Sequence, residues 1–411
     1  MMYESCSESA KDRRLLVFGD SSSIVFKDSK CRIEDHSGLT RILYNRMGKF
    51  KGLILHTNLV YDEERKMVLG ISSSEFVSRK ERSRSELGES YKRGKEIIEE
   101  KESYKWLKGF EKSKQTLEQS AHITLVADRE ADIIELFDRL PDSKTDLVIR
   151  SQHNRAIINE QGEKQRLEDF VKGLPVKGYE KIDVRGKKRK QRKAKMSIHY
   201  GRAKMCWTNP NDKKVKYKVN DGEIPFYVVE IREVKHRGYK KEARLKWRIL
   251  TTIPIENLET AKEVIKIYEK RWKIEEFFKL IKTDCFNVGN TELTRAKSIR
   301  KLILYVMKAS VKIQQLKSAR DGKIKIPMET VFSKKEIKYL KLINPRMEGK
   351  TEKQKNPFAD DSLAYGAWII ARLGGWKEYY TDKRPPGSKT FSWGLEKFEN
   401  MCLAFSIKDV S

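Results

Sequence analysis

Short apolar runs separated by polar turns dominate the first 150 residues. The runs RLLVFGD (14–20), GLILHTNLVYD (52–62) and KMVLGIS (66–72) have the length and residue types of strands, and the charged turn EER joins the last two. They predict an antiparallel meander. A Glu/Lys-rich segment from Ser83 to about Ser120 predicts a helix. HITLVA (122–127) and DLVIR (146–150) predict two more strands, with a helix-forming segment between them.

The pattern changes to β-rich pieces between about Gly178 and Thr252. Polar turns separate four strand-like runs there: YEKIDVRG, KAKMSIHYG, IPFYVVEIREV and LKWRILTT. An amphipathic helix follows, for which Thr260-x-x-Glu263 predicts a capping box, and the remaining chain reads as helical with Gly and Pro between helices. This order of elements predicts an α/β protein with a ribonuclease-H-like mixed sheet, a β-rich insertion domain and a helical C-terminal region.

Charge indicates the class of partner. Lysine and arginine number 88 against 59 acidic residues, which gives a formal net charge of +29. This excess predicts a polyanionic partner, with nucleic acid as the leading candidate and a lysine-rich or ribosome-associated protein as the alternative. The first residues lack an apolar signal sequence, and no apolar run reaches the roughly 18 to 20 residues that cross a bilayer. With five scattered cysteines and six dispersed histidines, the sequence predicts a cytoplasmic protein without a zinc site or catalytic histidine.

One helical segment, YEKRWKIEEFFKLIK (268–282), gathers its polar groups on one side. At 100° per residue, five side chains fall within an arc of roughly 80°: Tyr268, Arg271, Glu275, Lys279 and Lys282. Apolar side chains occupy another arc that can pack on a sheet: Ile267, Ile274, Phe277 and Ile281. The polar arc is either a phosphate-binding face or a solvated face with an i,i+4 ion pair, and the segment alone leaves both open.

Two aspartates favour the functional interpretation because each follows an apolar strand-like run. Asp20 follows RLLVFG, and Asp128 follows HITLVA. With Glu275 they predict a two-metal site for phosphodiester cleavage, since hard oxygen ligands suit Mg²⁺ or Mn²⁺. Asp35 in CRIEDHSG competes for the first position, but its polar and Gly-containing surroundings indicate a loop. We therefore assign Asp20.

The literal sequence of the helix adds a resemblance to a known family. YEKRWKIEEFFKLIK fits Y-x2-R-x3-E-x6-K, and it resembles the YREK-signature, hairpin-forming family of DDE insertion-sequence transposases (the Tn-five-like family). VADREADI resembles the family's second-aspartate motif. EKESYKW, RGKKRKQRKAKMSI and LVIRSQH are similar to its intervening segments, and LGG…PPG…WGLEKF is similar to its C-terminal region. The resemblance covers roughly Leu15 to Phe398.

The resemblance implies a transposase that cuts DNA at transposon ends through a hairpin intermediate and transfers them into target DNA. It implies a homodimer on double-stranded DNA, associated with the bacterial nucleoid in the cytoplasm. Asp20, Asp128 and Glu275 would hold two Mg²⁺ or Mn²⁺ ions per active site. DNA contacts would come from six residues: Tyr268, Arg271, Lys279 and Lys282 at phosphates, Arg150 at a strand end, and Trp247 stacked on a flipped base. For Trp247, a core position in a strand is the alternative.

Boundaries follow from the same resemblance. We expect the first part of the catalytic core over 1–150, the β-rich insertion over 151–252, the last part of the core with the YREK helix over 253–320, and the helical C-terminal region over 321–411. Within the insertion, the run from Lys181 to Lys195 holds nine basic residues against one acid. It predicts a loop along the DNA backbone, with a solvated turn as the alternative.

Two features depart from the family. Asp20-Ser21-Ser22 stands where the family usually has Asp-Thr-Thr, and the 19 residues before Asp20 are too few for its N-terminal end-binding domain. Two main classes of function follow from these departures. One is an active, metal-dependent DDE transposase. The other is an N-terminally shortened, non-catalytic partner that dimerises with the full-length transposase and inhibits it. A general nuclease on the same fold is a third possibility.

Overall fold

The computed structural model describes residues 2–26, 41–45, 48–77, 98–185, 191–206, 223–234, 244–377 and 385–408. Asp35, the rival for the first aspartate, lies outside the described residues. So do the centre of the basic run (186–190) and most of the first half of the helix expected from Ser83.

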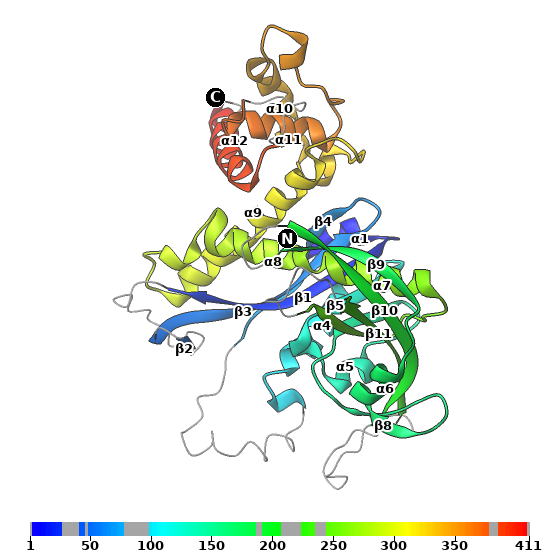
Figure 1. Ribbon diagram of the computed structural model, residues 1–411. Helices are drawn as coiled ribbons and strands as arrows, with labels where there is room; N and C mark the ends of the chain where they lie inside the picture. Colours follow the sequence, from blue (N-terminus) through cyan, green and yellow to red (C-terminus); the bar gives the residue numbers. More distant parts are fainter. Residues whose placement is uncertain are drawn as a thin grey trace.

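A twelve-stranded sheet passes through the described part of the molecule (Figure 1). Nine of its strands correspond to the apolar runs predicted from the sequence, and three short ones (41–45, 156–158 and 164–166) were not predicted. The twelve strands are β1 (Arg14–Val25), β2 (Arg41–Asn45), β3 (Gly48–Asp62), β4 (Met67–Val77), β5 (His122–Ala127), β6 (Thr145–Arg150), β7 (Ala156–Ile158), β8 (Lys164–Arg166), β9 (Gly178–Arg185), β10 (Gln191–Cys206), β11 (Glu223–Glu233) and β12 (Lys246–Thr251).

Five strands form the centre of this sheet in the order β4-β3-β1-β5-β6. The first three are the predicted meander, in which β1 and β4 both pair antiparallel to β3. β5 and β6 then add parallel strands beside β1, each reached through a helical crossover. Three antiparallel strands followed by two parallel ones give the mixed α/β sheet of a ribonuclease-H-like fold, as the sequence predicted.

The β-rich insertion continues this same sheet. β12 pairs antiparallel with β6, from Thr251 opposite Val148 to Ile249 opposite Arg150. β11 and β10 follow in order, and β9 and β7 both pair with β10. The insertion was expected as a domain of its own. Because β12 bonds directly to β6, its strands are a lateral extension of the core sheet.

Helices cover both faces of the sheet and form the C-terminal region (Figure 1). They are α1 (Met2–Ala10), α4 (Tyr104–Thr116), α5 (Ile134–Arg139), α6 (Leu167–Gly173), α7 (Leu258–Lys270), α8 (Trp272–Lys279), α9 (Ala296–Ala319), α10 (Lys334–Met347), α11 (Leu363–Leu373) and α12 (Ser388–Lys408). Among the residues described, none of the helices is both long and apolar enough to cross a membrane.

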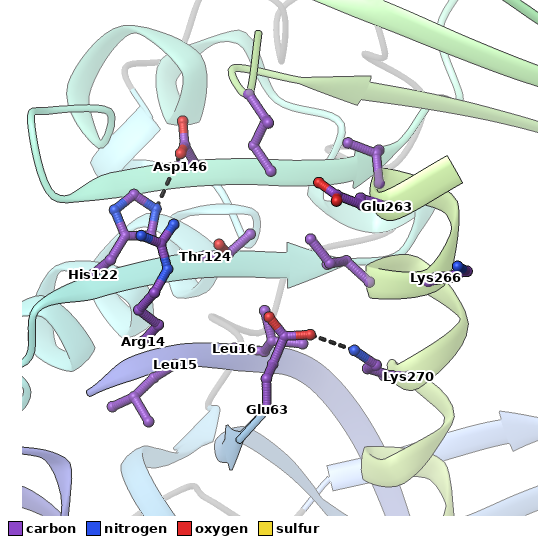
Figure 2. Close-up of a pocket in the computed structure, with 13 residues that line it drawn as sticks. Arg14, Leu15, Leu16, Glu63, His122, Thr124, Asp146, Glu263, Lys266 and Lys270 are labelled. Atoms are coloured by element: carbon purple, nitrogen blue, oxygen red, sulfur yellow. Dashed lines mark hydrogen bonds and ion pairs between the residues drawn. The ribbon is translucent and has the colours of Figure 1, made fainter. Parts of the chain in front are cut away.

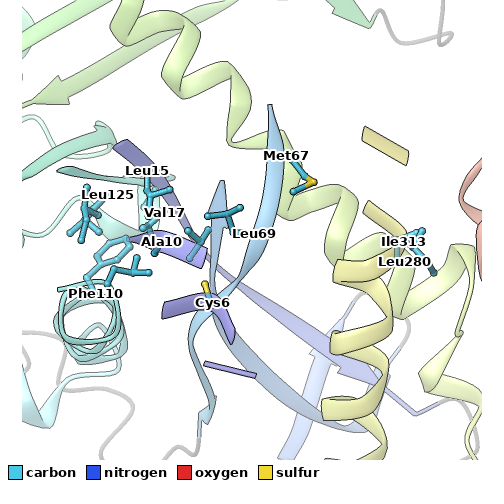
Figure 3. Packing of buried hydrophobic residues seen from close by; sticks show 14 of the residues in the cluster. Cys6, Ala10, Leu15, Val17, Met67, Leu69, Phe110, Leu125, Leu280 and Ile313 are labelled. Atoms are coloured by element: carbon cyan, nitrogen blue, oxygen red, sulfur yellow. The ribbon is translucent and has the colours of Figure 1, made fainter. Parts of the chain in front are cut away.

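Alternation along the strands divides the core between the two faces. Leu15 and Val17 of β1 point toward Phe110 of α4, and Figure 3 shows this packing with the neighbouring Leu125. The next residue, Phe18, points the other way, into a second cluster that contains Phe277 of α8. Because successive strand residues face opposite sides, each residue after Phe18 can be assigned to a face.

The C-terminal region depends on a close crossing of α11 and α12. A Cβ atom added to Gly394 of α12 would lie 1.9 Å from the backbone oxygen of Ile370 in α11. That separation is impossible for real atoms, so only glycine allows the two helices to approach this far. The crossing gives a physical reason for the glycine in the WGLEKF segment.

We expect Gly394→Ala to lower the free energy of unfolding of the C-terminal region by about 3 kcal/mol, because the added methyl group forces the helices apart. Urea unfolding followed by tryptophan fluorescence measures this change. Gly387→Ala is the matched control, since a Cβ atom there meets nothing within 4 Å. Equal stability of the two variants would contradict the close crossing.

Candidate active site

β1 carries Asp20 within the strand, whereas the sequence predicted that the strand ends at this residue. β3 pairs with β1 as far as Val25, and this antiparallel partner keeps the polar residues after Asp20 extended. The parallel partner β5, in contrast, pairs with β1 only as far as Phe18. Asp20 therefore lies just beyond the point where β1 loses its parallel neighbour.

Strand register places the two aspartates side by side. Phe18 pairs with Val126 in the parallel ladder, and Asp20 and Asp128 each follow two residues later. Asp128 keeps an extended backbone (φ −84°, ψ −165°), so the alternation of side chains continues to it. Neighbouring strands are about 4.8 Å apart, which makes the two carboxylates close neighbours at the same level of the sheet.

Both aspartates point to the face that α7 and α8 cover. Phe18 and Val126, two residues before them, belong to the cluster that also contains Phe277 of α8. Residues two apart on a strand share a face. Asp20 and Asp128 are therefore on the side of the sheet from which α8 presents Glu275.

The helix that carries Glu275 is broken, although the sequence predicted one continuous helix. α7 ends at Lys270 and α8 begins at Trp272. Around Arg271 the backbone bonds span three residues, from the Arg271 N–H to the Tyr268 oxygen (3.1 Å) and from the Ile274 N–H to the Arg271 oxygen (3.1 Å). The start also differs: Asn257 caps α7, with Thr260 as its capping-box partner, in place of the predicted Thr260–Glu263 box.

Arg271 lies at this break and joins two of the three acids. Its Nη2 donates a hydrogen bond to Glu275 Oε1, and its Nη1 lies 3.5 Å from Asp20 Oδ2. The Arg271 side chain is only 13% exposed. Burial lowers the pKa of Arg271. The nearby groups of Tyr268, Glu275, Asp20 and Asp128 raise it by more, so the net effect is a raised pKa. All three acids are thus within electrostatic reach of one guanidinium.

The pKa of Asp20 reflects its burial and the charged groups around it. Burial raises the pKa of its carboxyl to about 6, with Asp128 and Glu275 adding to the rise and Arg271 and the Ser21 N–H opposing it. The Ser21 N–H donates to Asp20 Oδ1 at 2.7 Å. Asp128 is held in a similar way, because its Oδ1 accepts the Glu130 N–H at 3.0 Å.

The donor set suits a hard divalent cation, since three carboxylates converge on one face. Among the described residues, however, no group of three or more His, Cys, Asp or Glu side chains is spaced to enclose an ion. The guanidinium of Arg271 takes up the space between Asp20 and Glu275. The residues therefore fit Mg²⁺ or Mn²⁺ in charge and donor type, and in this conformation they are arranged around an arginine.

The other predicted DNA contacts divide into two groups. Lys282 donates to Ser22 Oγ at 3.2 Å, and Lys279 pairs with Asp284 at 3.0 Å. Both lysines border the carboxylates, although a π-helical segment from Leu280 to Asp284 ends the regular helix before Lys282. Tyr268 is different: the break at Arg271 turns it into the apolar face of α7, where it is 5% exposed.

Arg150 and Trp247 extend the candidate site across the sheet. Ala127 pairs with Ile149, so Asp128 and Arg150 are at the same level on neighbouring strands. Arg150 in turn pairs with Ile249 of β12, and Trp247 lies two residues from Ile249 on the same face. The Trp247 ring, half-buried, meets the Tyr268 ring edge-on with 5.7 Å between centroids. The insertion thus brings both residues to the face of the carboxylates.

A buried histidine behind Asp20 was not found from the sequence. His56 Nδ1 is 2.9 Å from Ser21 Oγ, on the opposite face from Asp20, and Trp106 of α4 covers its ring. Burial lowers the pKa of His56 to about 3, so the ring is neutral at physiological pH. Gly109 of α4 permits this tight packing, since a Cβ atom there would lie 3.0 Å from His56 Nε2. In the sequence, His56 was signalled only indirectly, through the strand alternation that places its partner Ser21 on the opposite face from Asp20.

A cleft of about 410 Å³ lies at the other end of the same strands (Figure 2). Arg14, His122 and Asp146 line it from the first residues of β1, β5 and β6, and Lys270 of α7 pairs with Glu63 beside them. His122 Nε2 is 3.0 Å from Asp146 Oδ2. Arg14 lies six positions before Asp20 on β1, which is roughly 20 Å along an extended strand. The cleft is therefore not part of the carboxylate site.

Comparison with known protein families agrees with this arrangement. Residues 107–311 match the family model described as the transposase DDE domain. The chain carries a transposase DDE domain. The match begins within α4 and ends within α9, so it contains Asp128 and Glu275. Asp20 precedes the matched segment, and the pairing of β1 with β5 joins it to the other two acids.

The transposase domain accounts for the main features of the chain. DDE transposases act on DNA, which agrees with a net charge of +29. Transposases of this kind are generally dependent on divalent metals, which agrees with the carboxylate donors. The mixed sheet with its helical C-terminal region is consistent with a ribonuclease-H-like DDE transposase fold.

We expect Asp20→Asn to stabilise the metal-free protein at neutral pH. The pKa of Asp20 is about 6 in the folded protein, against an ordinary value of 3.8, so the stability of the wild type falls as pH rises through this window. The variant should gain about 2–3 kcal/mol over wild type above pH 6 and almost nothing below pH 4. Urea unfolding in EDTA between pH 4 and 7.5 tests this, and a difference that does not change with pH would contradict it.

Proposed function

We propose that this transposase domain catalyses metal-dependent cleavage at transposon ends and strand transfer into target DNA, with Asp20, Asp128 and Glu275 as its catalytic carboxylates. The observation that carries the proposal is their convergence. One acid comes from β1, one from the end of β5 and one from α8, and all are within electrostatic reach of Arg271. Separate elements that bring acids to one face of a sheet are typical of a functional site.

The carboxylates are held in ways that suit this chemistry. Backbone N–H groups bind one oxygen of Asp20 and one of Asp128, which fixes each side chain, and the second oxygen of Asp20 faces Arg271. Two Mg²⁺ or Mn²⁺ ions, when bound to the three acids, would supply Lewis acidity for activating the attacking hydroxyl and stabilising the leaving oxygen. Asp128 also begins a 3₁₀ turn, so its position depends on the local backbone.

We further propose that the basic residues of this face bind the DNA backbone. Lys279 and Lys282 follow Glu275 on the same helical segment, Arg150 lies level with Asp128 on the neighbouring strand, and their charges match phosphate. Arg271 and the Tyr268 hydroxyl are also proposed to contact DNA. Both side chains would have to move from their present positions to do so. Trp247 would stack on a flipped base during hairpin formation, because its half-buried ring lies on the catalytic face.

The hairpin of β9 and β10 is the proposed second DNA contact. It carries the flanks of the basic run, and within it Lys195 lies over the exposed Tyr179 ring, 4.4 Å from its centroid. Basic residues beside an exposed aromatic ring suit a nucleic-acid backbone. Binding through this hairpin should weaken steeply as salt concentration rises.

A homodimer on DNA is also proposed, with α12 as the contact surface. Trp393 and Leu403 of this helix are 57% and 66% exposed, and a dimer contact through α12 would remove their apolar surface from water. The same surface would serve the alternative function, in which the chain pairs with a longer transposase and inhibits it. The two functions differ in whether the chain itself cleaves DNA.

Glu275→Ala should abolish nicking and strand transfer on a duplex that carries the element's own ends, with a loss of at least about 10³-fold in Mg²⁺ or Mn²⁺. Glu276→Ala is the matched control, since Glu276 pairs with Lys273 and Lys317 and should leave activity within a few-fold. Absence of products from the wild type, together with suppression of a full-length transposase on mixing, would favour the inhibitor.

Trp247→Ala should reduce hairpin formation by about tenfold and leave the first nick nearly unchanged, because stacking of one base contributes about 1–3 kcal/mol. Denaturing gels of a single-end substrate separate nicked from hairpin products. Trp247→Phe should retain most hairpin formation, since a ring remains at the position. Equal loss of both steps in Trp247→Ala would instead indicate a packing role against Tyr268.

A further inference from the structure

We propose that Arg271 is a resident counter-cation of the carboxylate site. Its guanidinium holds Asp20 and Glu275 together until a divalent cation displaces it, and the released guanidinium is then free to bind a DNA phosphate. This inference rests on the proposed function, because it takes the three acids as the metal ligands. It adds that metal and arginine compete for the same oxygens.

The contacts of Arg271 are those of a bridging cation. Nη2 bonds Glu275 Oε1, and Nη1 faces Asp20 Oδ2 at 3.5 Å. Nη1 is buried and makes no hydrogen bond among the described residues. A buried donor without a hydrogen bond lowers the stability of the fold. The attraction of the two acids therefore keeps the guanidinium in this position. The guanidinium is therefore held electrostatically and incompletely satisfied.

The neighbouring cations do not take this role. Lys282 donates to the Ser22 hydroxyl, and Lys279 pairs with Asp284. Arg150 donates to the backbone oxygen of Lys246 at 3.4 Å. Without Arg271, the carboxylates on this face would repel one another in a partly buried site, where water screens charge poorly.

A divalent ion and the guanidinium cannot share these oxygens. Two cations at the same carboxylates repel, and arginine does not deprotonate in proteins, so it can yield only by moving. Its position permits this movement: Arg271 lies between α7 and α8, outside the regular bonding of either helix. The ring of Tyr268, with its centroid 5.9 Å from the guanidinium carbon, borders the space on one side.

Mn²⁺ binding to the DNA-free chain, followed by electron paramagnetic resonance, tests the competition directly. Arg271→Gln should bind Mn²⁺ about tenfold more tightly than wild type, although DNA cleavage falls. Arg271→Lys should lie between them, because it keeps the charge but loses the fork that spans both acids. Affinity in Arg271→Gln equal to or weaker than that of wild type would overturn the inference.

Thermal unfolding supplies an independent readout. In EDTA, Arg271→Gln should melt below wild type, and Mn²⁺ should raise its melting temperature more than it raises that of wild type. Arg192→Gln is the matched control, since Arg192 is equally exposed (13%) and pairs with Glu233 in the insertion. It should also lower the melting temperature, without an enhanced response to Mn²⁺. An equal response in both variants would overturn the inference.

Glu275→Gln separates the two hypotheses. It should weaken Mn²⁺ binding at least tenfold, because it removes a ligand. Unchanged Mn²⁺ binding in Glu275→Gln would overturn the proposed metal site itself, and with it this inference. Weakened binding in Glu275→Gln together with unchanged binding in Arg271→Gln would leave the metal site in place and overturn only the role of Arg271.

Discussion

The parallel pairing of β1 with β5 is the constraint on which the candidate site depends. Its register sets Asp20 level with Asp128, and the side-chain alternation that it enforces turns both acids toward α8. A slip of one residue would move one aspartate to the face of α4, among apolar side chains. The packing of the two faces opposes such a slip, because it would move Phe18 or Val126 out of the cluster that contains Phe277 and into the one that contains Phe110. Core packing and site geometry are therefore fixed by the same hydrogen bonds.

The break between α7 and α8 has an equally local effect. A continuous helix would leave Tyr268 and Arg271 on one polar surface, whereas the three-residue turn sends Tyr268 into the core and leaves Arg271 beside the acids. Packing explains the preference: Tyr268 reaches the Trp247 ring, while Ile274 is fully buried one turn later. Neither glycine nor proline marks the break, so its origin is tertiary.

Much of the fold was predictable from the sequence, since apolar runs of strand length report burial directly. The predicted strands appear, and Asp20, Asp128 and Glu275 meet on one face. The pairing of β12 with β6 was not predictable, because strand pairing between distant segments leaves no local pattern. The end of β1 was misplaced for a related reason: β3 supports the polar residues beyond Asp20. His56 was missed because its partner Ser21 looks like an ordinary polar strand residue.

A strongly basic chain that must also hold divalent cations faces opposing requirements. The long-range field of +29 attracts DNA and repels metal ions, but screening limits such fields to about 10 Å at ordinary salt concentrations. Inside that distance the potential is set by nearby groups. Asp20, Asp128 and Glu275 surround the single buried guanidinium of Arg271, whereas Lys279, Lys282 and Arg150 are directed to Asp284, the Ser22 hydroxyl and the Lys246 oxygen. The acids therefore create a local negative site within a positive surface. Their grouping on one sheet face, rather than the overall charge, determines which ion the site can accept.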